Sequence, residues 1–464
     1  MQIRVDKLRA NLALLQPVVP KKATLPVITH ILVQEGQMVA TDLENTVSLK
    51  VPEAQEDLLL PFHAVMELLK YVPGDEMLTL EPNVKTIKLS WKGGSASYEV
   101  KEAQDYPPIP EPEFQAEADL NGDLFIEALL AALPYCATES TRPVLTGVTV
   151  YLDNVLQIAG ADGFRLSYQS LKQSYPVKQT LILPASTVKV LEHLWHKSPS
   201  TVPLESSLVR QLMAVRPIKL SLVEGIAEFR FSNIHLITKL IAGTPPDHLA
   251  LLNNFREPIK VRLIAPELRN AVRCLEGIAK EGTGIVRLKW TDAIMTVSAR
   301  SEEKGEISAE IPVQPESLPG RVALNVKYLL EYLEGKEGLI TLGKDEGSSP
   351  ALFHYGSKPV VAIMPMNVHW DDDKPKTEAP AEETSGENEE SVEENQEAAG
   401  EAAEESESPI EEETPAEDRD ESPEELQSET VTAGVTAEAT SGENPSEPES
   451  IKAPEKRRGR RKKN

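Results

Sequence analysis

The sequence predicts an α+β protein made of three similar units, each with two helices and antiparallel sheets, followed by a disordered C-terminal tail. Within the first 370 residues, an extended apolar run leads directly into an amphipathic helix three times. The composition then changes abruptly after Trp370, the last aromatic residue of the chain. Similar segments that recur along a chain of 464 residues indicate several domains of like architecture.

Each unit contains a helix that starts at the end of an apolar run. The runs are Leu58–Pro61, Leu181–Pro184 and Val322–Asn325. Proline is favoured in the first turn of a helix and asparagine at the N-cap, so we expect helices to begin directly after these runs. Apolar residues then recur at helical spacing: Val65, Leu68, Leu69 and Val72; Val188, Leu191 and Leu194; Val326, Leu329, Leu330 and Leu333.

Another helix comes earlier in each unit, and strand-like runs follow both helices. The spacing of the units and the proline-rich joints at 106–112 and 243–247 predict domains at 1–118, 119–254 and 255–370, with a loop insertion near 196–211. The later helix of the second unit is expected to end between His193 and His196. The earlier helices have apolar faces formed by Leu8, Leu12 and Leu15, by Phe125, Ile126, Leu129, Leu130 and Leu133, and by Leu268, Val272, Leu275 and Ile278.

Residues 371–464 form the predicted tail, which is rich in Glu, Ser, Ala, Thr, Pro and Gly. The tail holds 31 of the 74 acidic residues and 11 of the 48 basic ones, so residues 1–370 carry a formal charge of only −6. Such a segment buries too little apolar surface to offset the entropy lost on ordering. Its basic end at 456–463 fits either a solubilising tail or a tether for nucleic acid or an acidic partner.

The two cysteines, Cys136 and Cys274, form no metal-binding pattern and indicate a reducing compartment. The charged start of the chain lacks the apolar core of a signal peptide, and no apolar stretch approaches the ~20 residues that span a bilayer. These features predict a cytoplasmic protein that uses no metal and no cofactor.

The sequence shows no catalytic constellation. Asp42, Glu44 and Asp162 could form a carboxylate site, but Asp42 and Asp162 occupy equivalent places in two units, where a strand turns. This equivalence favours a repeated structural turn. The sequence also lacks the phosphate-loop, nucleophile-elbow, zinc-protease and dinucleotide fingerprints. An enzyme is therefore the less favoured class of protein.

Four short motifs follow one another along the first 370 residues. They are Thr24–Val27 with 39–44, Arg142–Gly147 with Ala161–Leu166, Phe231–Leu240 with Pro246–Asp247, and Met364–Met366. In this order they resemble the family of the bacterial DNA polymerase III beta subunit, the sliding clamps, over about residues 1–368. The resemblance implies the DNA clamp fold, in which two chains join head to tail, six domains close a ring, and helices line the hole.

A sliding clamp holds its polymerase on duplex DNA through its topology and reads no sequence. The resemblance therefore implies four kinds of protein partner: the replicative polymerase catalytic subunit, a clamp loader, other clamp-binding-motif proteins, and a second copy in a homodimer ring. A non-replicative accessory module that acts through its acidic tail is the alternative function.

The lining of such a ring needs basic side chains that contact phosphates without specifying bases. Basic residues of this kind also form ordinary solvated helix faces, which is the alternative interpretation. The DNA-facing candidates, on or beside the paired helices, are Lys7, Arg9, Lys21, Lys22, Lys70, Arg142, Lys189, Arg269, Arg273, Lys280 and Lys327.

The resemblance also implies an apolar pocket between the second and third domains, into which partners insert a short motif. Methionine side chains suit several related peptides because they repack easily, although ordinary core packing would explain the same residues. Two features depart from the family: Asn367 stands where an arginine is usual, and the chain continues past Trp370. The first helix of the third domain, with Ile278, is expected at the ring interface. The pocket residues by motif match are Leu145, Gly163, Phe164, Arg165, Leu166, Pro246, Leu251, Ile363, Met364, Pro365 and Met366.

Overall fold

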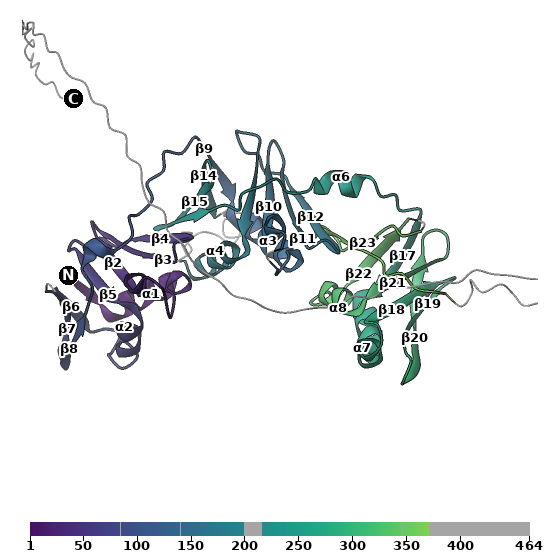
Figure 1. Ribbon diagram of the computed structural model, residues 1–464, viewed down its shortest axis with the longest axis horizontal. Helices are drawn as coiled ribbons and strands as arrows, with labels where there is room; N and C mark the ends of the chain where they lie inside the picture. The colour runs from purple at the N-terminus through teal and green to yellow at the C-terminus, as the bar shows by residue number, and fades with distance from the viewer. Residues whose placement is uncertain (84, 140, 199–215, 346, 371–464) are drawn as a thin grey trace, which may run out of the picture. The chain divides into compact units, whose positions relative to one another are not determined.

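The computed structural model describes residues 1–83, 85–139, 141–198, 216–345 and 347–370 (Figure 1). All of them belong to one compact unit, Met1–Thr377. The predicted tail at 371–464 and the predicted insertion, from residue 199 onwards, lie outside the described residues. No helix among the described residues is long and apolar enough to cross a membrane.

Among the residues that the structure describes, six helices recur in pairs, as the sequence predicts. Asn325 is the N-cap of the last one, and its side-chain oxygen accepts hydrogen bonds from the backbone N–H groups of Lys327 and Tyr328. The expected end of a helix between His193 and His196 is wrong, because that helix continues to Lys197. The pairs are α1 Val5–Leu15 and α2 Phe62–Leu68, α3 Gly122–Ala132 and α4 Ala185–Lys197, and α7 Ala265–Glu281 and α8 Val326–Leu333; a further helix, α6, spans His248–Asn253.

Within the described residues, each repeat contains eight antiparallel strands. The first repeat has β1 Gln2–Arg4, β2 His30–Gln34, β3 Gln37–Thr41, β4 Asn45–Lys50, β5 Leu58–Pro61, β6 Met77–Pro82, β7 Thr86–Trp91 and β8 Gly94–Glu99. The second has β9 Ala116–Asn121, β10 Gly147–Leu152, β11 Leu156–Ala161, β12 Arg165–Leu171, β13 Gln179–Pro184, β14 Pro217–Val223, β15 Ile226–Phe231 and β16 Ile234–Lys239. The third has β17 Ile259–Ile264, β18 Ile285–Trp290, β19 Ile294–Ser301, β20 Gly305–Pro315, β21 Gly320–Asn325, β22 Leu339–Lys344, β23 Ala351–His354 and β24 Val360–Ile363.

The strand order is the same in all three repeats. One set of four strands runs β5-β2-β3-β4 in the first repeat, β13-β10-β11-β12 in the second and β21-β18-β19-β20 in the third. The other set runs β1-β6-β7-β8, β9-β14-β15-β16 and β17-β22-β23-β24. The repeated helix and strand pattern of the sequence thus corresponds to a repeated topology (Figure 1).

The apolar faces predicted for the helices form the core. Leu8, Leu12 and Leu15 of α1 are fully buried, as are Leu268 and Leu275 of α7. These side chains pack against the inner faces of the sheets, because alternate strand residues point to the same side as the helices. Ile278 is only partly buried at the edge of the third repeat's core, so one of its sides remains uncovered.

Two strand pairs join the repeats into continuous sheets. Strand β4 pairs antiparallel with β16, from Asn45 opposite Thr238 to Leu49 opposite Ile234. Strand β12 pairs in the same way with β24, from Arg165 opposite Ile363 to Tyr168 opposite Val360. In both junctions the strand that ends the first set of four, β4 or β12, pairs with the strand that ends the second set in the next repeat, β16 or β24.

Candidate functional site

The turns that precede β4 and β12 have the same construction. An oxygen of Asp42 accepts hydrogen bonds from the backbone N–H groups of Glu44 and Asn45 at 3.0 and 2.6 Å. The corresponding oxygen of Asp162 accepts from the N–H groups two and three residues later, both at 2.9 Å. These carboxylates serve as turn-forming acceptors, which confirms the predicted structural turn. No group of three potential metal ligands occurs among the described residues.

Arg165 lies at the centre of the junction between the second and third repeats. Its guanidinium donates to Asp162 at 2.8 Å and to the carbonyl oxygen of Pro134 at 3.0 Å, and it also donates to Glu331 of α8. The ring of Tyr328 lies 4.4 Å below it, and the arginine side chain is 8% exposed. Arg165 therefore connects β12 to α8 and presents little surface to a ligand.

Four of the predicted pocket residues expose apolar side chains around this junction. Phe164 is 60% exposed, and Leu251 of α6, Met364 and Met366 are 45%, 43% and 37% exposed. The N–H of Met364 donates to the carbonyl oxygen of Phe164 at 2.8 Å, so the two residues are neighbours across β12 and β24. The Phe164 ring stacks on Tyr328 with centroids 6.3 Å apart. Large apolar groups that gather on the surface in this way are typical of binding sites.

The other predicted pocket residues support this surface from below or at its edge. Leu145, Leu166 and Ile363 are buried, and Pro365 is half-buried. Gly163 has a φ of 93°, a conformation that strains a residue with a side chain, and the equivalent Leu43 has a φ of 76°. The carbonyl oxygen of Pro246 accepts a hydrogen bond from the Tyr151 hydroxyl at 2.7 Å.

Helix α6 fixes the same junction on the outer face of the sheet. Leu249, Leu252 and Phe255, in and just after the helix, pack on a cluster that includes Leu166 of β12 and Ala362 of β24. The buried His248 completes the attachment, since its Nδ1 lies 2.8 Å from the Tyr151 hydroxyl. Because the Tyr151 hydroxyl donates its hydrogen to Pro246, the hydrogen bond between the hydroxyl and His248 is donated by Nδ1. Burial lowers the pKa of His248 to about 4.

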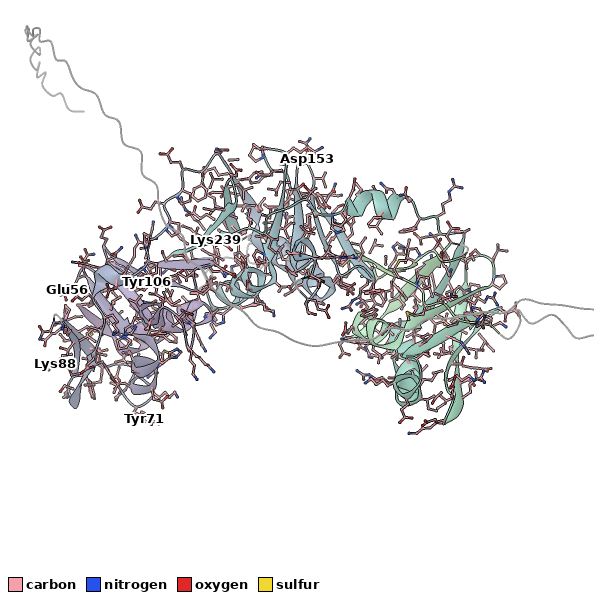
Figure 2. The ribbon with its side chains drawn as sticks, in the orientation of Figure 1. Glu56, Tyr71, Lys88, Tyr106, Asp153 and Lys239 are labelled. Atoms are coloured by element: carbon pink, nitrogen blue, oxygen red, sulfur yellow. The ribbon has the colours of Figure 1, made fainter. Side chains whose placement is uncertain are left out.

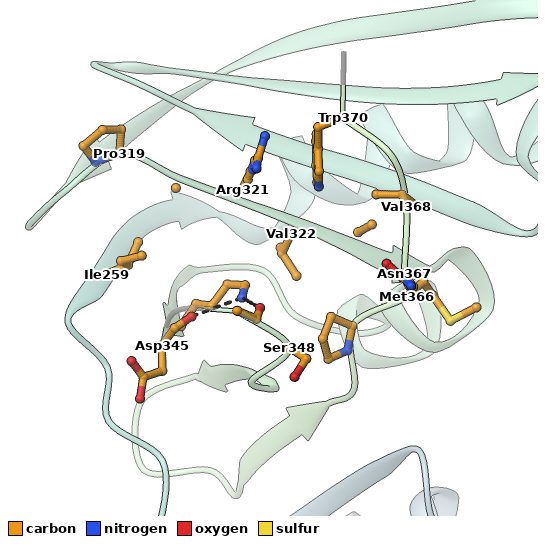
Figure 3. Close-up of a pocket in the computed structure, with 15 residues that line it drawn as sticks. Ile259, Pro319, Arg321, Val322, Asp345, Ser348, Met366, Asn367, Val368 and Trp370 are labelled. Carbon is orange, nitrogen blue, oxygen red and sulfur yellow. Dashed lines mark hydrogen bonds between the residues drawn. The ribbon is translucent and has the colours of Figure 1, made fainter. Parts of the chain in front are cut away.

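A hollow of about 590 Å³ adjoins the exposed apolar residues and includes Pro365 and Met366 in its lining (Figure 3). Val322 of β21 and Ile259 of β17 form apolar parts of its wall. The guanidinium of Arg321 lies 5.1 Å from the ring of Trp370, and the two side chains face each other in Figure 3.

Most of the predicted DNA-facing residues have acidic neighbours. Lys7 pairs with Glu53 and Lys70 with Glu67. Tyr71, the residue after Lys70, is 80% exposed and projects from the end of α2 (Figure 2). The remaining pairs are Arg269 with Glu337 at 2.8 Å, Arg273 with Glu334 at 3.0 Å, Lys280 with Glu276 at 2.6 Å, and Lys327 with Glu331 at 4.0 Å. Lys21, Lys22, Arg142 and Lys189 have no hydrogen bond or ion pair to another described residue through their side chains.

Arg9 and Arg269 make structural contacts that the helix pattern does not predict. Each is the fifth residue of the first helix of its repeat, and each donates to backbone carbonyls at the end of the second helix. Arg9 reaches the carbonyls of Leu69 and Val72, and Arg269 reaches those of Leu333 and Lys336 at 3.2 and 3.0 Å. Carbonyls at the end of a helix lack partners within the helix, so both arginines act as caps.

Sequence reasoning missed several residues of the candidate site. Tyr328 and Glu331 lie on the polar side of α8 and reach the junction only because that helix packs beside β12 and β24. A helical spacing of three from Tyr328 to Glu331 is the one signal that could have placed them on a common face. Lys344, Arg321 and Trp370 come together through strand pairing that the sequence alone does not reveal.

Comparisons with known proteins agree with this architecture. The family model for the central domain of the DNA polymerase III beta subunit matches residues 120–247. The beta sliding clamp of Pseudomonas putida is 25% identical over 384 residues, which cover 79% of this chain and 99% of that protein. The beta sliding clamp of Chlamydia muridarum is 23% identical over 383 residues, or 77% of this chain and 95% of that protein.

Solved structures show the same fold. The DNA polymerase III beta subunit of Thermotoga maritima superposes with a TM-score of 0.69 at 19% identity, covering 79% of this chain and 99% of that one. The subunit from Pseudomonas aeruginosa gives a TM-score of 0.70 at 21% identity with the same coverage of both chains. The DNA clamp fold predicted from the motifs is thereby confirmed.

Proposed function

We propose that the chain is a member of the family of the bacterial DNA polymerase III beta subunit, the sliding clamps, and that two copies close head to tail into a ring around duplex DNA. Clamps of this family are non-catalytic processivity subunits, so the chain supports DNA replication without chemistry of its own. In this proposal the three repeats act as domains with the predicted boundaries 1–118, 119–254 and 255–370.

The pairing of strands between repeats carries the proposal. Strands β4 and β12 end one set of four and pair with β16 and β24, which end the other set. By the same rule β20 requires a strand equivalent to β16 and β24, and that strand is β8. Within the described residues β8 pairs only with β7, and β20 pairs with β19 and, through its last three residues, with β17.

A second copy satisfies both edges at once. If β20 of each copy pairs with β8 of the other, the resulting two-fold dimer has no unpaired edge of this kind and cannot grow further. Half-buried apolar residues support this arrangement, because Tyr98 of β8 and Ile307 of β20 each pack on their own core while leaving one side uncovered. Ile278 of α7 lies at the edge of the same core and is a third candidate contact.

The basic residues support a weak and sequence-independent hold on DNA. Lys21, Lys22, Arg142 and Lys189 supply charges free to meet phosphates, whereas most of the helix cations are partly neutralised by nearby carboxylates. Each phosphate that a lysine or arginine neutralises releases counterions and strengthens binding. Fewer free charges give weaker contacts, and weak contacts allow a closed ring to slide.

The exposed apolar surface at the second junction is the proposed docking site for partner proteins. Phe164, Leu251, Met364 and Met366 form a group of flexible and aromatic side chains on a rigid base of paired strands. Such a surface accepts a short apolar motif from the polymerase catalytic subunit, the clamp loader or other clamp-binding-motif proteins. Arg165 positions the surface through its contacts with Tyr328 and Glu331.

Retention on circular DNA tests the proposed function. The full-length protein is loaded by its clamp loader onto nicked circular duplex, and bound protein is measured before and after the circle is linearised. A topological clamp stays bound to the circle at a salt concentration of about 0.5 M, where phosphate contacts are weak, and leaves when the DNA is cut. Equal loss from circles and linear DNA would contradict the proposal.

A further inference from the structure

We propose that the junction between the first and second repeats carries an additional docking groove, which binds an acidic and partly apolar segment of a partner protein. The groove occupies the same place at the first junction as the exposed apolar surface does at the second. The inference rests on the proposed function, because it takes the second junction as a docking site and extends that role to an equivalent position with different chemistry.

The backbone after the paired strands begins in the same way at both junctions. The N–H of Lys239, at the end of β16, donates to the carbonyl oxygen of Glu44 at 3.0 Å (Figure 2). In the same way the N–H of Met364, just after β24, donates to the carbonyl oxygen of Phe164 at 2.8 Å. Glu44 and Lys239 therefore occupy the positions of Phe164 and Met364, the two most prominent residues of the docking surface.

The equivalence continues two residues further along the chain. The N–H of Ile241 donates to the carbonyl oxygen of Ile182 in β13 at 3.0 Å, and the N–H of Met366 donates to that of Ala323 in β21 at 2.8 Å. Strands β13 and β21 lie at the same end of equivalent sets of four strands. Ile241 therefore corresponds to Met366, and the two junctions offer the same backbone frame with different side chains.

A groove of about 800 Å³ opens at the first junction beside these residues. Leu133, Leu240 and Ile241 line it and are half-buried, so each keeps an apolar surface that a ligand can cover. Lys239 lines the groove from β16, and Lys189 lines it from the second turn of α4. Apolar and cationic groups thus share one concave surface, which is typical of a site for a short protein segment.

The two lysines of the groove have no partner of their own. Lys189 and Lys239 are exposed, and their ammonium groups form no hydrogen bond or ion pair with another described residue. By contrast, Lys7 and Lys327 each pair with a glutamate. Glu44 is the one acidic residue among the described lining residues, and every residue directly adjacent in sequence to the lining is described. The two ammonium groups are therefore available to a carboxylate.

The charges also separate this groove from the docking surface of the second junction. A purely apolar motif that covers Phe164 and Met364 would have to strip water from Glu44 and Lys239 at the first junction, without giving either a new partner. A segment with carboxylates beside an apolar side chain instead pairs with the lysines and covers Leu240 and Ile241. The two junctions therefore select different segments, and the charges contribute specificity more than affinity.

Labelled peptides added to the full-length protein test the groove. The acidic peptide has a Leu-Phe centre flanked on both sides by Asp residues, and its matched control has Asn in place of Asp. Fluorescence anisotropy measures binding of both to the wild-type protein, to the double variant Lys189→Gln, Lys239→Gln and to the control variant Lys172→Gln, Lys178→Gln. The control lysines are exposed in the loop before β13, whereas the groove lies at the other end of that strand.

We expect the wild-type protein to bind the acidic peptide roughly fivefold or more tightly than the Asn peptide. The double variant should lose this preference and the control variant should keep it, with thermal unfolding as a check that both are folded. An apolar motif peptide from the polymerase catalytic subunit should not displace the acidic peptide, since the two occupy different junctions. Displacement would place the acidic peptide at the second junction and overturn the proposal.

The remaining outcomes separate the groove from the proposed function. If the motif peptide binds but the acidic peptide does not bind at about 1 mM, or binds like its Asn control, the groove is wrong and the docking surface stands. An acid preference that survives in the double variant overturns the groove as well. If the double variant loses affinity for duplex DNA while no acid preference exists, the lysines belong to the DNA lining. Failure of the motif peptide to bind wild-type protein would count against the docking surface itself.

Discussion

Arg165 of β12 and Glu331 of α8 form an ion pair that joins the second repeat to the third. The first junction has a neutral counterpart at the equivalent position, where the side-chain oxygen of Asn45 accepts a hydrogen bond of 2.8 Å from the hydroxyl of Thr187 in α4. In both junctions the third residue after a turn-forming aspartate contacts the second helix of the next repeat. The repeats are thus joined by a side-chain contact as well as by paired strands.

Replacing Arg165 with Leu should destabilise the protein by about 2–3 kcal/mol, because the largely buried Asp162 carboxylate would lose its ion pair and the Pro134 carbonyl would lose a donor. Glu331 is 40% exposed and contributes less. Chemical denaturation measures the change. Arg262→Leu is the matched control, since its pair with Glu316 lies at the surface and should cost less than about 0.5 kcal/mol. Equal effects of both substitutions would show that Arg165 is not a structural connection.

Substitutions of basic residues should divide into two classes. Arg269→Met should lower stability by about 1–2 kcal/mol, because two backbone carbonyls lose a donor, while the salt dependence of DNA binding stays unchanged. The double substitution of Lys21 and Lys22 by Ala should leave stability within about 0.5 kcal/mol and reduce the slope of log K against log salt by about 1–2. Unfolding curves and salt titrations of DNA binding measure the two effects. A smaller slope of log K against log salt for Arg269→Met would instead show that Arg269 contacts DNA.

Partner binding should depend on the exposed apolar side chains at the second junction. Met364→Ala and Phe164→Ala should each weaken binding of a clamp-binding peptide by about 10-fold or more, since each removes a large contact from a small site. Both variants should keep wild-type stability. Leu318→Ala is the control, because that residue is 63% exposed and belongs to neither the docking surface nor the hollow. Unchanged peptide affinity in both junction variants would place the docking site elsewhere.

Stability should fall with acid partly through His248. Burial lowers the pKa of this residue from 6.5 to about 4, so below pH 6.5 the unfolded chain binds a proton that the folded chain excludes. The folded state therefore loses stability as the pH falls from 6.5 towards 4, by about 2 kcal/mol at pH 5. Comparing the free energy of unfolding at pH 7.5 and pH 5 for wild type and His248→Gln isolates this contribution. The same pH dependence in both proteins would contradict the assignment.

The sequence predicts the repeats, the helix pairs and the turns because each depends on local spacing. Leu8, Leu12 and Leu15 identify a buried face within 8 residues. Asp42 and Asp162 occupy equivalent positions in two repeats and therefore predict the same turn in each. The roles of Arg9, Arg269 and Arg165 depend on carbonyls and carboxylates that lie 31 to 166 residues away in the chain. A helix pattern shows that such arginines avoid the core, and it does not reveal which acceptors the fold brings to them.

The oligomeric state of the full-length protein tests the proposed ring most directly. Electron-microscope images and sedimentation should show closed two-copy rings with a central hole for duplex DNA, and a Tyr98→Glu, Ile307→Glu variant should sediment as a folded single copy, because each substitution places a charge in the strand interface. Wild-type protein that remains a single open copy at micromolar concentration, or a double variant that still forms rings, would contradict the pairing of β8 with β20.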